Sequence, residues 1–274
     1  MAGFTMSIAE IAEAVPDGAL LGVPADYSGV PMAVTKALIA RGAKDLDLYC
    51  LPLTTIQGDM LIGAGCVRSI ETAAVTLGEY GLAPRFSAAV QAGDIAIKDS
   101  TCPALHAQLQ AVEKGVPFMP LRGLIGSDLL RYRPDWQVID NPFAETSDPL
   151  VLLPARALDV TVFHAAMADS DGNIFIGRRR ELATLAHASR QLFVTVERFV
   201  EGSLLDSEET AAGVLPAFYL DGIAEAVEGA WPCGLSDLYN PDGKELGRYA
   251  ALAKSAEGFA DYLESLGLRT LAPA

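Results

Sequence analysis

Polar side chains gather in the segment HAAMADSDGNIFIG, residues 164–177, in an order that partly matches a calcium-binding loop. A loop of the EF-hand type needs oxygen ligands at positions 1, 3 and 5, a glycine at position 6 and a glutamate at position 12. Counted from Asp169, the first three positions carry side-chain oxygens, but the sixth is Ile174 and the twelfth is Arg180. Because a positive charge replaces the closing ligand, we predict no metal site here.

A turn between two strands explains the same segment better. The flanking runs DVTVFHA and NIFIG are rich in β-branched and aromatic residues, and the Asp-Gly pair that ends at Gly172 is a strong hairpin signal. We predict that Asp169, Gly172 and Asn173 hold this hairpin, and that they neither bind metal nor act on substrate. His164 is expected to be a strand-end histidine held by a neighbouring residue.

Carboxylates are the remaining candidate nucleophiles. No serine lies in a G-x-S-x-G elbow, and the three histidines are far apart in the sequence, so serine-hydrolase and zinc chemistry are both weakly indicated. A glutamate can attack an activated acyl group and form a mixed anhydride. The candidates are Glu71, Glu79 and Asp99, although an acid in such a position is more often a surface or capping residue.

The loop GVPADYSGVP, residues 22–31, follows a strand-like run and precedes a helical one. Free backbone N–H groups and the helix dipole converge at such a junction and favour an anion. Neither G-x-G-x-x-G nor a P-loop is present, so no nucleotide is indicated, and a turn without a ligand is the alternative. The candidate substrate-binding residues are those of this loop and two glycines that allow close backbone approach near Glu79: Gly22, Asp26, Tyr27, Ser28, Gly29, Gly78 and Gly81.

The chain is strongly acidic, which argues against nucleic acid as a partner. Its formal net charge is −15 and its pI is about 4.5, so most of its surface would repel a phosphate backbone. The run Arg178-Arg179-Arg180 is a local exception. Such a run is typical of a solvated or subunit-facing helix start, or of a site for an anionic ligand or an acidic partner.

Cysteine usage and the N-terminal residues predict a cytoplasmic protein. The four cysteines are scattered without a Cys-x-x-Cys pair and are expected to be reduced. Residues 1–18 carry glutamates where a signal peptide would carry lysines, and no apolar run approaches the roughly 20 residues that span a bilayer. We therefore expect no association with a membrane.

Strand-like and helix-like segments alternate from residue 17 to residue 121, which indicates a parallel sheet covered by helices. From residue 141 the strands follow one another closely, and we interpret them as a continuation of that sheet. The prediction is one α/β domain over residues 1–274, an open, mostly parallel mixed sheet flanked by helices. Its C-terminal region, about 243–266, is expected to be helical.

Six segments occur in an order that resembles the α (A) subunit of family I coenzyme A transferases, most closely the glutaconate CoA-transferase type. The segment from His164 to Asn173 is similar to the family signature H-x-x-x-A-D-x-x-G-N. The six segments, which span nearly all of the chain, are DGALLGVPADYSGVPMAVTKALIARGAKDLDLYC, LIGAGCVRSIE, VQAGDIAIKDST, GVPFMPLRGLIGSDLL, HAAMADSDGN and VTVERFV.

This resemblance implies a fold shared with sugar-phosphate isomerases and an enzyme built from α and β subunits, as an α2β2 heterotetramer. The implied nucleophile is a glutamate of the β chain, which carries coenzyme A as a thioester between an acyl-CoA and a carboxylic acid. No permanently bound cofactor is implied. Some members of the fold instead hydrolyse cyclic β-diketone CoA esters with an acid of the A chain, which would here be Glu79 or Asp99. A non-catalytic ligand-binding protein is a second alternative.

Overall fold

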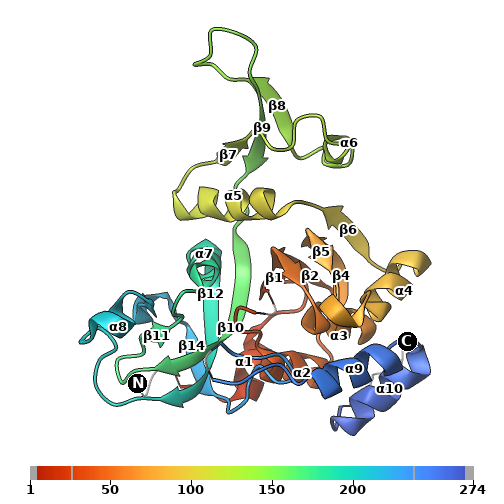
Figure 1. Ribbon diagram of the computed structural model, residues 1–274, viewed down its shortest axis with the longest axis vertical. Coiled ribbons are helices and arrows are strands. Elements are labelled where there is room, and N and C mark those ends of the chain that lie inside the picture. Colours follow the sequence, from red (N-terminus) through yellow and green to blue (C-terminus); the bar gives the residue numbers. More distant parts are fainter. Residues whose placement is uncertain (1–4, 26, 237, 269–274) are drawn as a thin grey trace.

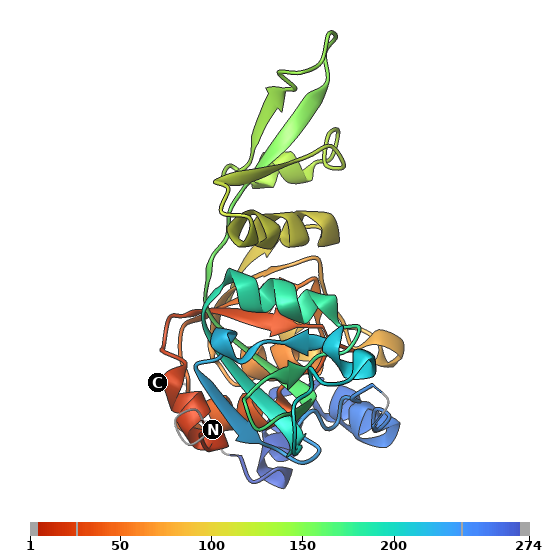
Figure 2. The same ribbon diagram turned by 90° about the vertical axis from the view of Figure 1, so that its left-hand side faces the viewer.

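The computed structural model describes residues 5–25, 27–236 and 238–268. Its body is a nine-stranded sheet with helices on both faces, and a smaller unit projects from the body (Figures 1 and 2). Of the predicted substrate-binding residues, Asp26 lies outside the described residues. The positions of all the others can be compared with the predictions.

The central sheet is mostly parallel, as the alternating pattern predicts. Strands β6, β4, β2, β1, β10, β12 and β14 are parallel neighbours in that spatial order, and β11 and β13 add antiparallel pairs. The bounds are β1 (Leu20–Pro24), β2 (Leu46–Leu51), β4 (Val67–Thr72), β6 (Ala96–Asp99), β10 (Leu158–Ala168), β11 (Ile174–Phe175), β12 (Ser189–Phe199), β13 (Val214–Leu215) and β14 (Gly222–Glu225).

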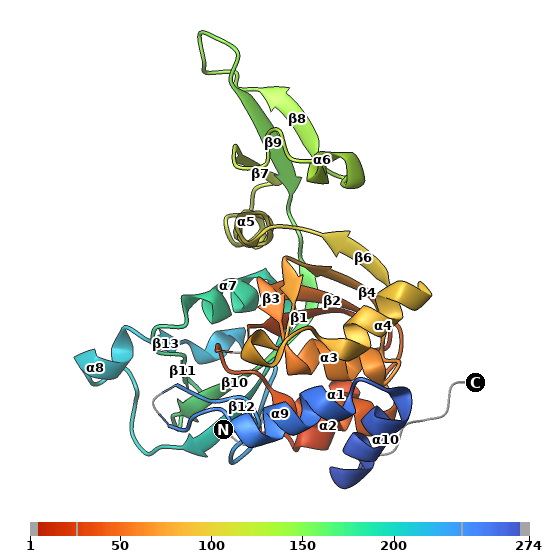
Figure 3. The same ribbon diagram turned by 45° about the vertical axis from the view of Figure 1, so that its right-hand side comes forward.

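Two hydrophobic cores lie on opposite faces of this sheet. Alternate residues of one strand point to opposite faces, so Val162 of β10 belongs to one core and Phe163 to the other. The first core is covered by α1 (Ile8–Ala14), α2 (Met32–Arg41), α3 (Ile56–Gly63), α9 (Gly243–Leu252) and α10 (Ala256–Ser265). The second is covered by α5 (Cys102–Glu113) and α7 (Arg180–Ala188), as Figure 3 shows. Helix α4 (Pro84–Ala92) packs on α3.

The projecting unit corrects the sequence interpretation. Strands β7 (Phe118–Leu121), β9 (Pro149–Pro154) and β8 (Gln137–Asp140) form a separate antiparallel sheet in the order β7-β9-β8, with the short helix α6 (Leu129–Tyr132) beside it. The runs at 116–121 and 150–155 were expected in the main sheet. An apolar run identifies a strand but not its neighbours, and β9 is paired on both edges before the chain enters β10.

Local signals fix several helix ends. A capping box of Ser7 and Glu10 begins α1, and Gly42 ends α2 in the left-handed conformation, with φ 71°. The N-cap of α2 is Pro31, so neither Ser28 nor Gly29 caps this helix. Both residues lie in the loop before the helix, which leaves them available to the site described below.

The remaining described elements are short. They are the parallel pair β3 (Leu53–Thr54) and β5 (Ala74–Val75), the 3₁₀ turns η1 (Gly78–Tyr80) and η2 (Ala217–Tyr219), and α8 (Glu208–Ala211). The four cysteines are free. None of the helices within the described ranges has the length and apolar character needed to cross a membrane.

Candidate functional site

A crevice opens where two strands part along one edge of β10. The first half of β10 pairs with β1, at Val160 and Thr161, and its far end pairs with β11, at Met167 and Ala168. The chain leaves β1 between these two pairings and turns away as the loop that contains Tyr27–Gly29. Ligands of open α/β sheets bind at such carboxyl-terminal strand ends, where neighbouring connections diverge.

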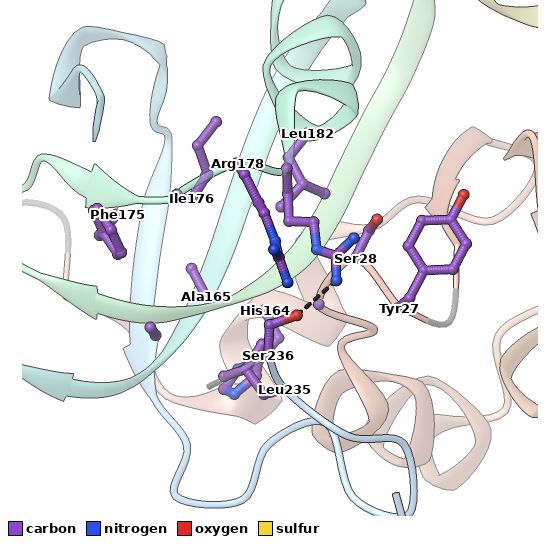
Figure 4. Close-up of a pocket in the computed structure, with 14 residues that line it drawn as sticks. Tyr27, Ser28, His164, Ala165, Phe175, Ile176, Arg178, Leu182, Leu235 and Ser236 are labelled. Carbon is purple, nitrogen blue, oxygen red and sulfur yellow. Dashed lines mark hydrogen bonds between the residues drawn. The ribbon is translucent and has the colours of Figure 1, made fainter. Parts of the chain in front are cut away.

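The crevice holds a hollow of about 60 Å³. Its floor is β10 at His164–Ala166, one wall is the loop Tyr27–Gly29, and the opposite wall runs from Phe175 to Arg179 and Leu182. Leu235 and Ser236 close it from a later loop, and Figure 4 shows these side chains around the hollow. Among the described residues that line it, none is an aspartate or glutamate.

Gly29 is required for this geometry. Its φ is +76°, a conformation that strains residues with a side chain, and an added Cβ would lie 1.9 Å from the carbonyl oxygen of His164. In return, the Gly29 carbonyl accepts a hydrogen bond of 2.7 Å from the His164 amide. The loop is thus held directly against β10, which sets the width of the crevice.

The His164 ring is held at both of its nitrogens. Its imidazole is fully buried, with Nδ1 2.8 Å from Thr195 Oγ1 and Nε2 2.7 Å from Glu197 Oε1. Glu197 also accepts hydrogen bonds from the Tyr239 hydroxyl, at 2.7 Å, and the Glu228 amide, at 2.7 Å. Burial would raise the pKa of Glu197, but these hydrogen bonds outweigh it and lower the pKa to about 2. The crevice floor therefore rests on an ionised carboxylate.

Two arginines stand at the mouth of the crevice. Arg179 Nη2 donates to Ser236 Oγ at 2.6 Å, and its guanidinium carbon lies 5.2 Å from the centre of the Tyr27 ring. The Arg178 side chain is directed into the hollow toward Ser236 (Figure 4). Across the crevice, the buried Ser28 hydroxyl donates to the carboxylate of Glu181. This end of the crevice can bind an anion.

Two further hollows continue from the crevice along the loop 233–241. One, of about 480 Å³, shares Tyr27, Leu235 and Ser236 with the first, and the next, of about 290 Å³, is reached past Gly234 and Pro241. The three hollows follow one another in series and form one groove. The last hollow is lined by η1, which includes Gly78 and Glu79.

The structure separates the predicted catalytic carboxylates. Glu79 is exposed beside the third hollow, whereas Asp99 ends β6, the exposed edge strand, and its Oδ1 accepts from the Ser100 amide. Glu71 is buried in an ion pair with Arg133, at 2.6 Å, on the side that faces the projecting unit. Only Glu79 of the three therefore lies at the groove.

Glycines of the predicted substrate-binding set have different roles. Gly22 lies inside β1, where an added Cβ would lie 2.1 Å from Thr161 Oγ1, so close packing within the sheet accounts for it. Gly78 and Gly81 have φ of +60° and +101° and face open space, as the turn around Glu79 requires. Of the loop residues, Tyr27, Ser28 and Gly29 line the crevice.

The predicted hairpin is present between β10 and β11. Asp169 Oδ1 accepts from the amides of Asp171 and Asn173, and its Oδ2 accepts from Asn173 Nδ2 and from the Leu204 amide. Gly172 supplies the positive φ of +88°. Burial would raise the pKa of Asp169, but the hydrogen bonds lower it. Both carboxylate oxygens are occupied, and the described residues contain no group of three or more metal-ligating side chains.

The sequence patterns do not indicate Glu197, Ser236 or Tyr239, and they leave open whether Arg178 and Arg179 lie at an anion site or on a solvated surface. The one available signal was a glutamate inside the apolar run VTVERFV, where an unpartnered charge would be costly. The loop 233–241 carries no motif. Its contribution depends on contacts with residues more than 40 positions away, such as that of Tyr239 with Glu197.

Comparison with known proteins identifies the following similarities. A sequence description of the coenzyme A transferase family matches residues 4–226. An uncharacterized protein of Archaeoglobus fulgidus is 30% identical over 96% of this chain, which spans only 59% of that protein's length. The A subunit of 3-oxoadipate CoA-transferase from Pseudomonas knackmussii is 29% identical over 91% of this chain and 88% of its own. The cholesterol ring-cleaving hydrolase IpdA subunit of Rhodococcus jostii is 29% identical over 85% of this chain and 81% of its own.

Solved structures confirm the predicted fold class. Glutaconate coenzyme A-transferase of Acidaminococcus fermentans superposes with a TM-score of 0.86, covering 95% of this chain and 87% of the other, at 24% identity. The decarboxylase AibA/AibB superposes with a TM-score of 0.82 at 29% identity, covering 95% of this chain and 97% of the other. The same fold therefore occurs in proteins named for different reactions on this scaffold.

Proposed function

The chain belongs to the coenzyme A transferase family, as its ordered segments predict, and from this premise we propose that it is the A subunit of an acyl-CoA:carboxylate CoA-transferase. The observation that carries the proposal is the groove at the carboxyl-terminal strand ends, with a cationic crevice at one end. An enzyme that passes coenzyme A between two acids must hold a thioester and a carboxylate along one site. The relative named as the A subunit of 3-oxoadipate CoA-transferase supports the assignment.

The covalent steps take place on a glutamate of a partner B subunit. Its carboxylate attacks the thioester carbonyl of the donor, coenzyme A leaves as the thiolate, and an acyl-glutamyl anhydride forms. The thiolate then attacks the glutamyl carbonyl, which releases the donor acid and leaves a glutamyl-CoA thioester. The acceptor carboxylate attacks that thioester to form a new anhydride and release the thiolate. The thiolate then attacks the acceptor acyl carbonyl of this anhydride, which forms the new acyl-CoA and releases the glutamate carboxylate.

This chain binds and orients the acyl groups in that cycle. The loop Tyr27–Gly29 and the segment Phe175–Arg179 enclose the acyl end, and the loop 233–241 lines the path toward the thioester. His164 lines the crevice floor and is held by Glu197, so that the floor keeps its shape when the ligand changes. None of these steps needs a permanently bound cofactor.

Assembly and location follow from the same proposal. The chain forms an α2β2 heterotetramer with a homologous B subunit, and its substrates are an acyl-CoA and a small carboxylic acid. Its four free cysteines fit the reducing cytoplasm. Its charge of −15 makes nucleic acid an unsuitable partner.

Intact-mass measurement tests the proposal directly. The chain is coexpressed with its B subunit, and the complex is mixed with an acyl-CoA without acceptor. A coenzyme A adduct on the B chain, lost after addition of a carboxylic acid with formation of a new acyl-CoA, is the expected result. Glu79→Gln and Asp99→Asn are expected to retain the transfer.

Hydrolysis is the outcome that would overturn this proposal. Glu79 lies at the groove, and the ring-cleaving hydrolase is a relative. Catalysis by an acid of this chain is therefore the specific alternative to catalysis by a glutamate of the B subunit. Release of product without an acceptor, without an adduct on the B chain and abolished by Glu79→Gln would assign the chain to that reaction. Asp99→Asn is the matched control because Asp99 lies on the exposed edge strand.

A further inference from the structure

The run Arg178-Arg179-Arg180 divides into two parts in the structure. Arg178 and Arg179 line the crevice, whereas Arg180 Nη1 donates to the Ala212 carbonyl at 3.0 Å and does not line it. Two of the three charges are therefore concentrated at one hollow of an acidic protein. The third supplies a natural control, since it is adjacent in sequence and equal in charge.

Among the described residues, the acids near this hollow do not pair with its arginines. Glu181 accepts from the Ser28 hydroxyl, and Glu197 is engaged by His164, Tyr239 and the Glu228 amide below the floor. Arg178 has no hydrogen bond or ion pair with any side chain in the part of the chain that the structure describes. An anion in the hollow would meet guanidinium groups with unused donors.

Arg179 is held in place but not saturated. Its contacts with Ser236 and the Tyr27 ring fix the guanidinium plane, while Nε is buried without a hydrogen-bond partner among the described residues. An arginine carries five N–H donors in a rigid fork that matches a carboxylate. Because Nε is buried, a ligand in the crevice would be bound through the charge of the guanidinium and its Nη groups.

The size of the hollow selects among anions. At about 60 Å³ it can hold only a small polar group, and the adjoining hollow of about 480 Å³ can hold the chain attached to that group. The shared residues Tyr27, Leu235 and Ser236 make the two hollows continuous. We propose that Arg178, Arg179 and Ser236 bind the free terminal carboxylate of a dicarboxylic substrate while its other carboxyl group exchanges coenzyme A. This inference rests on the proposed function and deepens it by naming the substrate class.

Matched acids test the inference. Glutarate and pentanoate have the same chain length and differ by one terminal carboxylate. The purified complex with the B subunit is titrated calorimetrically with each acid. Each acid is also assayed as the acceptor, together with the other pairs of dicarboxylic and monocarboxylic acids of equal length, from three to six carbons. We expect Arg178→Ala and Arg179→Ala to weaken glutarate binding and raise its KM about tenfold to a hundredfold, because a charged hydrogen bond is worth roughly 1.5–3 kcal/mol. Pentanoate should change by less than about threefold.

Further arms separate this inference from the proposed function and from binding of a coenzyme A phosphate. Arg180→Ala should leave both acids unchanged, and Arg178→Lys should recover part of the glutarate affinity. Equal losses for both acids, or a raised KM for the acyl-CoA donor alone, would place the arginines at coenzyme A and overturn the inference. Equal use of both acids by the unchanged complex would overturn it while leaving CoA transfer intact. Transfer to no acid of the series would overturn both.

Discussion

The body of the molecule and the projecting unit are stabilised in different ways. The body has an extensive core on each face of its sheet, and the polar groups beneath the crevice are hydrogen-bonded to one another. The projecting unit packs only a small set of side chains, Leu124, Trp136, Val151 and Leu153, against Ala104 and Ala107 of α5, and its strand β8 is exposed throughout. The candidate site thus lies where the scaffold is most constrained, as positioning of a ligand requires.

One buried ion pair joins the two regions. Arg133 comes from the projecting unit, donates to Glu71 of β4 at 2.6 Å and to the Asp99 carbonyl at 3.0 Å, and stacks on Trp136. The side chains of Arg133 and Glu71 are 2% and 4% exposed. Because both charges are removed from water, the link is strong only while both partners remain. A single substitution should therefore break it.

The largest expected effect is that of Arg133→Leu. It leaves the Glu71 carboxylate buried with only Arg156, 3.7 Å away, as a partner, so we expect a loss of roughly 3 kcal/mol, the lower part of the range for such pairs. Urea unfolding measures it. The double variant Glu71→Leu with Arg133→Leu should recover much of the stability, and Arg131→Ala, whose ion pair is exposed, should change little. Equal losses in Arg131→Ala and Arg133→Leu would contradict this account.

Glu197→Gln tests the body in the same way. The carboxylate accepts hydrogen bonds from the Glu228 amide and the Tyr239 hydroxyl. A glutamine side chain replaces one of the two accepting oxygens by an NH₂ group, so one of these hydrogen bonds is lost. We expect a loss of roughly 2 kcal/mol at pH 7. The Glu197 pKa is lowered to about 2, so its contribution is fully present above its unfolded value near 4.5 and disappears as the pH falls toward 2. The difference between the two proteins should shrink over that range.

Unfolding followed from pH 7 to pH 2 checks the sign of this effect. A difference that grows as the pH falls would show that Glu197 is not ionised in the folded protein. Tyr239→Phe serves as a control, because it removes the hydrogen bond donated to Glu197 and the one accepted from the Ala230 amide but keeps the charge of Glu197.

A comparable loss is expected for Gly172→Val in the hairpin beside the crevice. The residue has φ +88°, and a Cβ there would lie 3.4 Å from Ala217 Cβ, so the cost arises from backbone strain and not from a collision. We expect roughly 1–3 kcal/mol by thermal unfolding. Gly172→Asn should cost less, since asparagine tolerates this conformation. If calcium raised the melting temperature relative to chelator, the turn would have the metal role that we exclude.

Sequence patterns predict the body much better than the site. The alternation of strands and helices, the hairpin at Gly172 and the end of α2 at Gly42 depend on local conformational preferences, and each is present. The crevice depends on the point where β1 and β11 part along β10, which no local pattern records. For the same reason the three arginines were recognised as a cluster, but their division between crevice and surface followed only from the start of α7.

In the projecting unit, too, the sequence pattern identifies the strands but not their pairing partners. Its strands are apolar runs like those of the main sheet, and only the pairing of β9 with β7 and β8 distinguishes them. Pairing partners are set by long-range contacts that compete during folding, so the residues of one strand do not determine them.

The smallest expected effect is that of Arg122→Ala, at an ion pair of the projecting unit that contrasts with the buried one. Arg122 donates to Asp148 at 2.9 and 2.5 Å, and Asn141 donates to the same carboxylate at 2.7 Å. The hydrogen bond from Arg122, then that from Asn141, lowers the pKa of Asp148 to about 2. Any stability from this ionisation is present above the ordinary aspartate pKa and is lost as the pH falls toward 2.

The Arg122 side chain is 66% exposed, however, so water and salt screen the attraction between Arg122 and Asp148. We therefore expect the melting temperature of Arg122→Ala to be close to that of the unchanged protein at low salt and indistinguishable from it in 0.5 M salt, a concentration at which the screening length is about 4 Å. Asp148→Asn, which keeps the contact with Asn141, is the control. A loss as large as that of Arg133→Leu would mean that burial is not what distinguishes the two ion pairs.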